Sequence, residues 1–229
     1  MIHIPSMSVT YKSSQFVVYP RVELITDCMS KKNGIYEVLC VVNNGSKQVC
    51  SVRFFNELSA QKSYLIYQYV LEILATQTTS AISLNTNVNF LKSHYIEMLL
   101  SEFGSTEIIL ELMETSPLDS IIHIEDRINE IKLHPRVSVW LDDFGTERAN
   151  FDLMNLIDFD AVKMSKELFW DLLENDKTLL KYLVKMIKRK VNIIVIEGVD
   201  SFDKYIFCKE QQCFMQGYFF NEVESSAVC

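Results

Sequence analysis

The chain has 229 residues, of which 48% are hydrophobic and 23% are charged, as is typical of one folded domain with a substantial core. Its net charge of −8 argues against a surface that binds duplex nucleic acid through the phosphates. A small anionic ligand is not excluded, because bound metal ions can reverse the local field.

No export or membrane signal is visible in the sequence. The first residues lack a basic region followed by an apolar core, and no apolar run reaches the length of a membrane span. The six cysteines show no CxxC spacing, which favours scattered reduced thiols. We therefore expect a cytoplasmic protein without a membrane segment.

The first part of the chain predicts two strands and one helix. Residues 1–13 are expected to be a poorly organised lead-in, followed by a strand over 15–19 that Pro20 closes. A second apolar, β-branched strand is expected over 35–42, and Glu37 is the one carboxylate inside it. Apolar residues then recur at helical spacing from 55 to about 76, which predicts an amphipathic helix.

A repeated pattern of strand, polar end residue and helix follows. The expected strands are 81–85, 108–111, 137–142, 159–163, 192–196 and a last short one within 213–217. The expected helices run through 91–99 and over 118–132, 150–156, 166–173, 177–190 and 201–210. About seven such units in one chain favour a parallel α/β sheet closed into a TIM-like (β/α) barrel over residues 14–229.

Polar side chains stand where these strands end, and in such barrels the active site is built there. They are Asn85, Glu111, Asp142, Asp143, Lys163, Glu197 and Gln216, with Glu37 added from the second strand. The adjacent carboxylates of Asp142 and Asp143 repel each other unless a positive charge lies beside them. Oxygen ligands without His or Cys select Mg²⁺ or Mn²⁺, and so many acids suit a pair of ions.

Two neighbouring metal ions suit displacement at phosphorus, with Lys163 orienting the water or the phosphate and Glu197 acting as base or ligand. Each acid taken singly is more often a helix cap or a solvated loop residue. Glycines close behind three strand-end polar groups, Gly198 and Gly217 directly and Gly145 two positions after Asp143, favour a common site. The residues by themselves therefore indicate a metal-dependent barrel enzyme and nothing narrower.

Over roughly residues 14–221 the chain resembles the EAL-domain family of bacterial cyclic-di-GMP phosphodiesterases. The name-giving motif is similar to Glu37-Val38-Leu39, in an EVL form. The other matching motifs stand in the same order, at Leu84-Asn85, Leu110–Thr115, Leu141–Thr146, Asp160–Lys163, Glu197–Asp200 and Gln216–Tyr218.

This resemblance implies hydrolysis of cyclic-di-GMP to linear pGpG with two Mg²⁺ or Mn²⁺ ions. One ion would be held by Glu37, Asn85, Glu111 and Asp142, and the second by Asp142 and Asp143. Lys163 and Glu197 would serve the attacking water. The substrate side would include Leu39, Asp160 and Gln216, and Glu114 would stabilise the loop after the two aspartates. A homodimer is also implied.

The chain departs from the family pattern at a few places. Val41 stands where the family usually has an arginine that contacts substrate phosphate, and residues 147–150 replace a glycine- and serine-rich loop. Ser165 stands in place of an aspartate. These departures motivate a second hypothesis, a weak or inactive protein that binds cyclic-di-GMP or a partner protein as a regulator. A third is a barrel enzyme that acts on another phosphoester.

Overall fold

The computed structural model describes residues 2–27, 34–113, 124–146 and 151–220. In these ranges ten strands form a single sheet. They are β1 (Met7–Tyr11), β2 (Ser14–Thr26), β3 (Ile35–Asn44), β4 (Lys47–Val49), β5 (Ala81–Thr86), β6 (Ile108–Leu112), β7 (Val137–Phe144), β8 (Ala161–Met164), β9 (Ile193–Ile196) and β10 (Phe214–Gln216).

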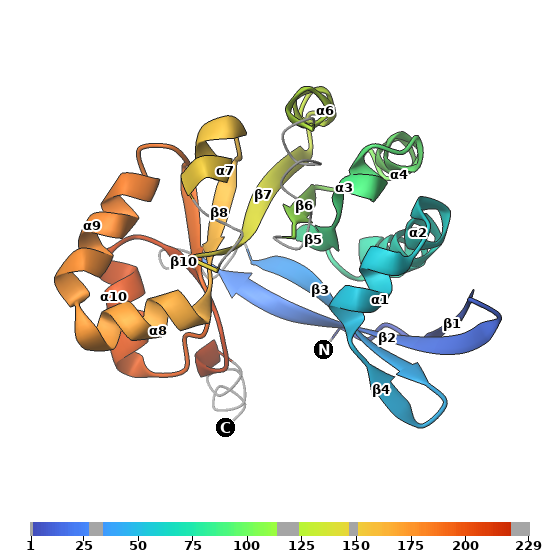
Figure 1. Cartoon of the computed structure of the whole chain (residues 1–229), viewed down its shortest axis with the longest axis horizontal. Helices are drawn as coiled ribbons and strands as arrows, with labels where there is room; N and C mark the ends of the chain where they lie inside the picture. The colour runs from blue at the N-terminus through green and yellow to red at the C-terminus, as the bar shows by residue number, and fades with distance from the viewer. Residues whose placement is uncertain (1, 28–33, 114–123, 147–150, 221–229) are drawn as a thin grey trace.

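Eight of the strands close into a barrel (Figure 1). The order is β2-β10-β9-β8-β7-β6-β5-β3, and the pairing of β2 with β3 closes it. Strand β2 is antiparallel to both neighbours, whereas the pairs from β3 through β10 are parallel. The expected (β/α) barrel is confirmed.

Strand β2 is longer than the sequence pattern indicated. Pro20 does not close it, because it pairs with Cys40 within an antiparallel ladder that continues to Ile25. A proline removes only its own donor from such a ladder. The expected lead-in also contains an unpredicted strand, β1, which pairs with β2. Figure 1 shows β1 and β4 beyond the barrel, at one end of the β2–β3 ribbon.

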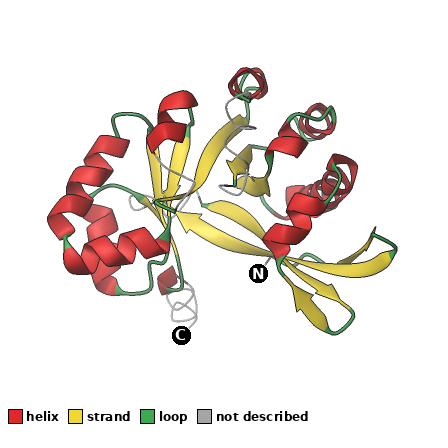
Figure 2. Ribbon diagram, in the orientation of Figure 1, coloured by secondary structure: helices red, strands yellow, loops and turns green. Residues whose placement is uncertain are grey.

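The helices lie outside the strands on both sides of the barrel in Figure 2. They are α1 (Ser51–Glu57), α2 (Ala60–Gln77), α3 (Val88–Leu91), α4 (Tyr95–Glu102), α6 (Glu125–Ile131), α7 (Phe151–Leu156), α8 (Lys166–Asn175), α9 (Lys177–Ile187) and α10 (Phe202–Glu210). Within the described residues, none of them combines the length and the apolar character needed to cross a membrane.

The single helix expected over 55–76 is in fact two helices. The chain is extended at Leu58 and at Ser59, and the Ser59 side chain accepts a hydrogen bond from the Lys62 amide, which caps α2. Serine at this position supplies an acceptor for the first turn of the helix, so the break is encoded locally. The helix expected over 118–132 is described only from residue 124, where α6 begins one residue later.

One end of the barrel interior is filled by an apolar layer, to which every barrel strand contributes. Its residues are Ile25, Ile35, Ala81, Ile109, Trp140, Ala161 and Val195, with Phe214 packed against them. Side chains alternate between the two faces of a strand, so the next inward residue lies two positions further along. In that next layer the inward side chains are polar or charged.

Candidate active site

A ring of polar side chains lies directly above the apolar layer. On seven strands the polar residue comes two positions after the residue of the apolar layer. On β2, which runs in the opposite direction, the polar residue comes two positions before it. We call it the polar layer, and its members are Glu23, Glu37, Ser83, Glu111, Asp142, Lys163, Glu197 and Gln216. It holds five carboxylates against one ammonium group.

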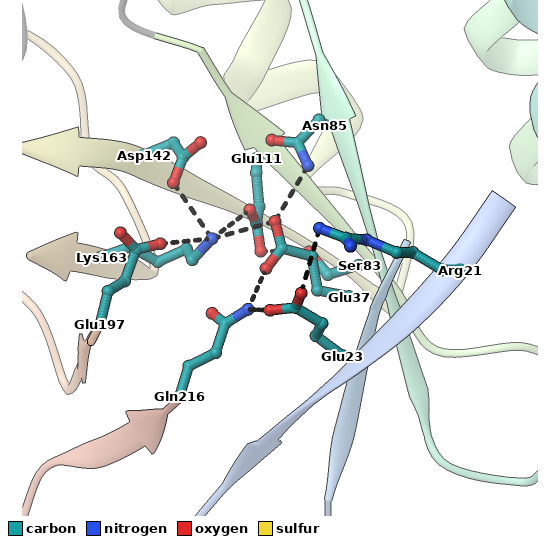
Figure 3. A network of polar contacts seen from close by, with 10 residues as sticks. All are labelled: Arg21, Glu23, Glu37, Ser83, Asn85, Glu111, Asp142, Lys163, Glu197 and Gln216. Atoms are coloured by element: carbon teal, nitrogen blue, oxygen red, sulfur yellow. Dashed lines mark hydrogen bonds and ion pairs between the residues drawn. The ribbon is translucent and has the colours of Figure 1, made fainter. Parts of the chain in front are cut away.

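The ammonium group of Lys163 is at the centre of the polar layer (Figure 3). Its Nζ lies 2.8 Å from Glu111 Oε2 and 3.2 Å from Asp142 Oδ1. Glu37 Oε1 and Glu197 Oε1 are each 3.1 Å away. The side chain of Lys163 is only 2% exposed, so one buried cation offsets part of the negative charge of four carboxylates.

Amide and hydroxyl groups orient the buried glutamates. Glu37 accepts hydrogen bonds from Asn85 Nδ2 at 3.0 Å and from Gln216 Nε2 at 2.6 Å. Ser83 Oγ donates to Glu111 Oε1 over 2.5 Å. Gln216 Nε2 also lies 3.3 Å from Glu23 Oε2, which joins strand β2 to the layer.

The two adjacent aspartates reach the same space because the strand is distorted between them. In a regular strand, consecutive side chains point to opposite faces. Here the pairing of β7 with β8 shifts between Leu141 and Phe144, and Asp143 has a φ of +52°. Aspartate tolerates this left-handed conformation better than most residues. Carboxylate oxygens of Asp142, Asp143 and Glu197 consequently lie within 4.8 Å of one another.

Burial and charge separate the acids of the polar layer into two kinds. Burial raises the pKa of Glu197 to about 7, with Asp142 and Glu37 adding to the rise and Lys163 opposing it. Burial, followed by repulsion from Glu37, raises the pKa of Glu111 well above its usual range. A carboxyl group that titrates near neutral pH is suited to take a proton from a reacting water.

Glu37 behaves in the opposite way. Burial by itself raises the pKa of Glu37, but the Lys163 ammonium group and the hydrogen bonds from Asn85 and Gln216 bring it below its usual value. For Lys163, burial lowers the pKa, and the surrounding carboxylates more than reverse this and raise it well above normal. Glu37 is therefore ionised and Lys163 is protonated. The remaining electrostatic repulsion falls on the neighbouring carboxyl groups.

The polar layer opens into a cleft of about 330 Å³. Its walls are mostly apolar and come from β3, α1 and α2, and its floor includes Glu37, Asp142, Asp143, Lys163 and Glu197. A second cleft of about 410 Å³ begins on the other side of Glu37 and Glu197. A mostly apolar space with a few convergent polar groups is typical of a small-molecule site.

Most of the residues expected at the site meet there. Leu39 lines both clefts. The other members that the structure brings together are Glu37, Asn85, Glu111, Asp142, Asp143, Lys163, Glu197 and Gln216. The acidic group of Asp142, Asp143 and Glu197 is compatible with either role that the residues left open for Glu197, base or ligand, whereas the resemblance implied service to the water. Glu114 and the loop 147–150 lie outside the described residues.

Asp160 does not join the other predicted site residues. It precedes β8, at the barrel end opposite Lys163, where Oδ2 accepts a hydrogen bond from the Val139 amide at 2.7 Å. Its Oδ1 lies 3.0 Å from Lys132 Nζ. The substrate-binding role expected for Asp160 is corrected to a structural one, because the side chain links β7, β8 and α6.

Three residues of the site were not predicted from the sequence. Glu23 and Ser83 belong to the polar layer, and Arg21 lines the first cleft. Arg21 and Glu23 were hidden because the strand was expected to end at Pro20. The alternation of Arg21 and Glu23 with the apolar Val22 and Leu24 is the signal that would have revealed a longer strand.

A family model described as EAL domain matches residues 105–222, which is 118 of the 229 residues. The chain belongs to the EAL domain family. The matched part of this EAL domain contains Glu111, Asp142, Lys163, Glu197 and Gln216. Glu37 and Asn85 precede it, so the expected EVL form of the motif at Glu37 stays a prediction.

Curated relatives of the EAL domain carry an enzymatic name. The cyclic di-GMP phosphodiesterase PdeH of Escherichia coli (strain K12) is 32% identical over 84 residues, which are 35% of this chain and 33% of PdeH. The cyclic di-GMP phosphodiesterase TpdA of Vibrio parahaemolyticus is 25% identical over 222 residues, 93% of this chain and 38% of TpdA. The chain thus spans about a third of the length of these two relatives.

Solved structures share the fold of the EAL domain at low identity. An EAL domain protein from Listeria monocytogenes EGD-e has a TM-score of 0.69 and 18% identity, over 91% of this chain and 92% of that one. The Bacillus subtilis YkuI protein, crystallised with c-di-GMP and calcium, has a TM-score of 0.73 and 17% identity, over 89% and 55%. These likenesses establish the architecture.

Proposed function

We propose that this EAL domain hydrolyses cyclic-di-GMP to linear pGpG in a reaction that requires Mg²⁺ or Mn²⁺. One observation carries the proposal: carboxylates of Asp142, Asp143 and Glu197 converge within 4.8 Å at the floor of a cleft, beside the buried Lys163. The curated relatives named as cyclic di-GMP phosphodiesterases supply the substrate.

The donor set fits hard divalent cations. The polar layer offers carboxylate and amide oxygens and no thiolate or imidazole, which favours Mg²⁺ or Mn²⁺ over zinc. Among the described residues, the buried Gln216 Oε1 has no hydrogen-bond partner, so it is a further acceptor available to a bound water or ion. We assign one ion to Asp142 and Asp143, beside which Glu197 is left to serve the water.

The second ion is assigned to Glu37, Asn85, Glu111 and Asp142, as the resemblance implies. When bound, a pair of such ions lowers the pKa of a water and neutralises charge that develops on the phosphate. The rest of the chemistry falls to side chains of this chain.

Hydrolysis joins the water oxygen to phosphorus and breaks the bond from phosphorus to the 3′ oxygen of the sugar. We assign the water's proton to Glu197, because its carboxylate lies beside Asp142 and Asp143 and, without bound metal, burial raises its pKa to about 7. Lys163 Nζ, 3.1 Å from Glu197 Oε1, orients that carboxylate. The leaving 3′ oxygen takes its proton from solvent.

A binding protein without turnover is the second candidate function. It is favoured by the position of the Lys163 ammonium group, which lies within 3.2 Å of four carboxylates and already supplies part of the positive charge that metals would bring. In that case the cleft would bind cyclic-di-GMP, or a partner protein would bind to the domain. The departures at Val41 and 147–150 are consistent with this role.

A turnover assay decides between the two. Purified protein with Mn²⁺ is incubated with cyclic-di-GMP, and pGpG is quantified by chromatography with and without EDTA. We expect metal-dependent pGpG formation that falls about 10²- to 10⁴-fold in Glu197→Gln and disappears in Glu37→Ala. The matched control is Glu174→Gln, an exposed acid on α8. Binding without pGpG would support the second candidate instead.

The cytoplasmic location and the homodimer expected from the sequence belong to the same proposal. Light scattering on the purified protein tests the dimer directly. A protein partner also stays a prediction. A monomer that turns over cyclic-di-GMP would mean that catalysis does not require the dimer.

A further inference from the structure

Arg21 occupies the layer directly above the polar layer on the inner face of β2. Glu23 pairs with Glu37 in the β2–β3 ladder, and Arg21 pairs with Leu39 one step higher. Arg21 lines the same cleft as Asn85 and Leu39. Figure 3 shows its side chain reaching from β2 toward the carboxylates.

The charge of this cleft makes Arg21 stand out. Of the described residues that line it, Arg21 and Lys163 are the cations, against the acids Glu37, Asp142, Asp143 and Glu197. Lys163 is 2% exposed and already lies between four carboxylates. The side chain of Arg21 is 59% exposed, so it is the cation that a ligand in the cleft can reach.

The ion pair of Arg21 with Glu23 leaves part of the guanidinium group available to a ligand. Its Nη2 lies 3.4 Å from Glu23 Oε1, while the other oxygen of Glu23 faces Gln216 at 3.3 Å. A long, partly exposed pair of this kind contributes little to stability. It keeps the guanidinium beside the cleft and leaves donors of the planar group available to an anion.

We propose that Arg21 binds a non-bridging phosphate oxygen of the phosphodiester ligand in this cleft. The inference rests on the proposed function for the identity of that ligand. A guanidinium group presents paired donors that match the oxygens of a phosphate, and its charge offsets acids that would otherwise repel the ligand. Arg21 thus adds a binding residue to a site whose other groups serve metal and water.

The β2–β3 register also explains how the chain manages with Val41, where an arginine was expected. Val41 pairs with Tyr19, so Arg21 is its diagonal neighbour on the same face of the ladder. Diagonal neighbours are about 7–8 Å apart, within the reach of an arginine side chain. An arginine on β2 can therefore deliver its charge to the space that an arginine at position 41 would serve.

The test measures binding of cyclic-di-GMP by calorimetry in Ca²⁺, the ion present in the YkuI complex, and does not depend on turnover. We expect Arg21→Gln to weaken binding about 10- to 100-fold, the loss typical of a charge-assisted hydrogen bond, and Arg21→Lys to lie between it and the wild type. Arg21→Gln, Val41→Arg is expected to recover binding to within about 3-fold of the wild type, since it restores one guanidinium group.

Lys181→Gln, an exposed position on α9, controls for the change in net charge. Thermal unfolding checks that each variant is folded. We expect the Arg21 variants to fold, because the side chain of Arg21 is largely exposed. Equal affinity of Arg21→Gln and the wild type would overturn the inference, as would a loss no larger than that of Lys181→Gln.

The outcomes also separate this inference from the proposed function. Wild-type protein that binds cyclic-di-GMP in an Arg21-dependent way but forms no pGpG in Mn²⁺ would remove the enzyme and keep the assignment of Arg21. If the wild type forms pGpG and Arg21→Gln binds cyclic-di-GMP as tightly as the wild type, the enzyme is kept and the assignment of Arg21 is removed. Wild-type protein that neither binds nor hydrolyses it would overturn both.

Discussion

The Nζ of Lys163 lies 2.8 Å from Oε2 of Glu111, and both side chains are sealed from solvent, with 2% and 0% exposure. One strand, β7, separates the β6 strand of Glu111 from the β8 strand of Lys163, and the barrel curvature brings the two side-chain tips together. Buried ions require partners, because an unpaired charge in the interior is strongly unfavourable. The stability of the metal-free protein therefore depends on this contact.

Replacing Lys163 with methionine leaves four carboxylates without their common cation. At pH 7 in EDTA we expect the free energy of unfolding to fall by about 3–5 kcal/mol. The loss should be smaller at pH 5, because protonated carboxyl groups no longer repel. Urea unfolding at both pH values measures it, and Lys166→Met, at a 55% exposed lysine, is the control. An equal loss at the two pH values would contradict this account.

Glu197 makes the metal-free protein less stable as the pH rises. Its pKa is about 7 in the folded state against 4.5 ordinarily, so the stability associated with the protonated form is complete below pH 4.5 and lost by about pH 7. Between these limits, the free energy of unfolding should fall by about 2–4 kcal/mol more in the wild type than in Glu197→Gln. Urea titrations in EDTA across this range provide the comparison, and parallel curves would refute it.

Divalent metal should stabilise the fold through Asp143. Binding to the folded state alone raises the free energy of unfolding by about 2.7 kcal/mol at a hundredfold excess over the dissociation constant. We expect Mn²⁺ to raise the melting temperature of the wild type, and Asp143→Asn to lose most of that shift. Glu174→Gln should keep it. A shift that survives in Asp143→Asn would place the ion elsewhere in the barrel.

Gly217 allows β10 to pass close to the chain after β9. Its φ is +154°, and a Cβ atom built there would lie 2.3 Å from the carbonyl oxygen of Val199. Gly217→Ala must displace backbone next to Gln216, so we expect a loss of about 2–4 kcal/mol in stability together with reduced turnover. Gly104→Ala meets only ordinary contacts and should change stability by under about 1 kcal/mol. Chemical denaturation of both variants tests the difference.

The sequence alone was sufficient for the barrel and for most of its polar layer. Runs of apolar residues that end in Glu111, Lys163 or Glu197 are local patterns, and a parallel sheet places such strand ends at one edge whatever their order. The motif around Asp142 and Asp143 was readable for the same reason. These inferences needed only the period of the strands and the chemistry of the side chains.

Tertiary structure decided which residues share the cleft. Pro20 obscured the second half of β2 because a proline ends many strands, and only the pairing of β2 with β3 and β10 shows that Arg21 and Glu23 face the site. Asp160 was placed on the substrate side by the family resemblance, yet it stands at the start of its strand. Position along the chain does not determine which end of a closed sheet a residue faces. That depends on strand direction and register, which are set by contacts between strands far apart in the sequence.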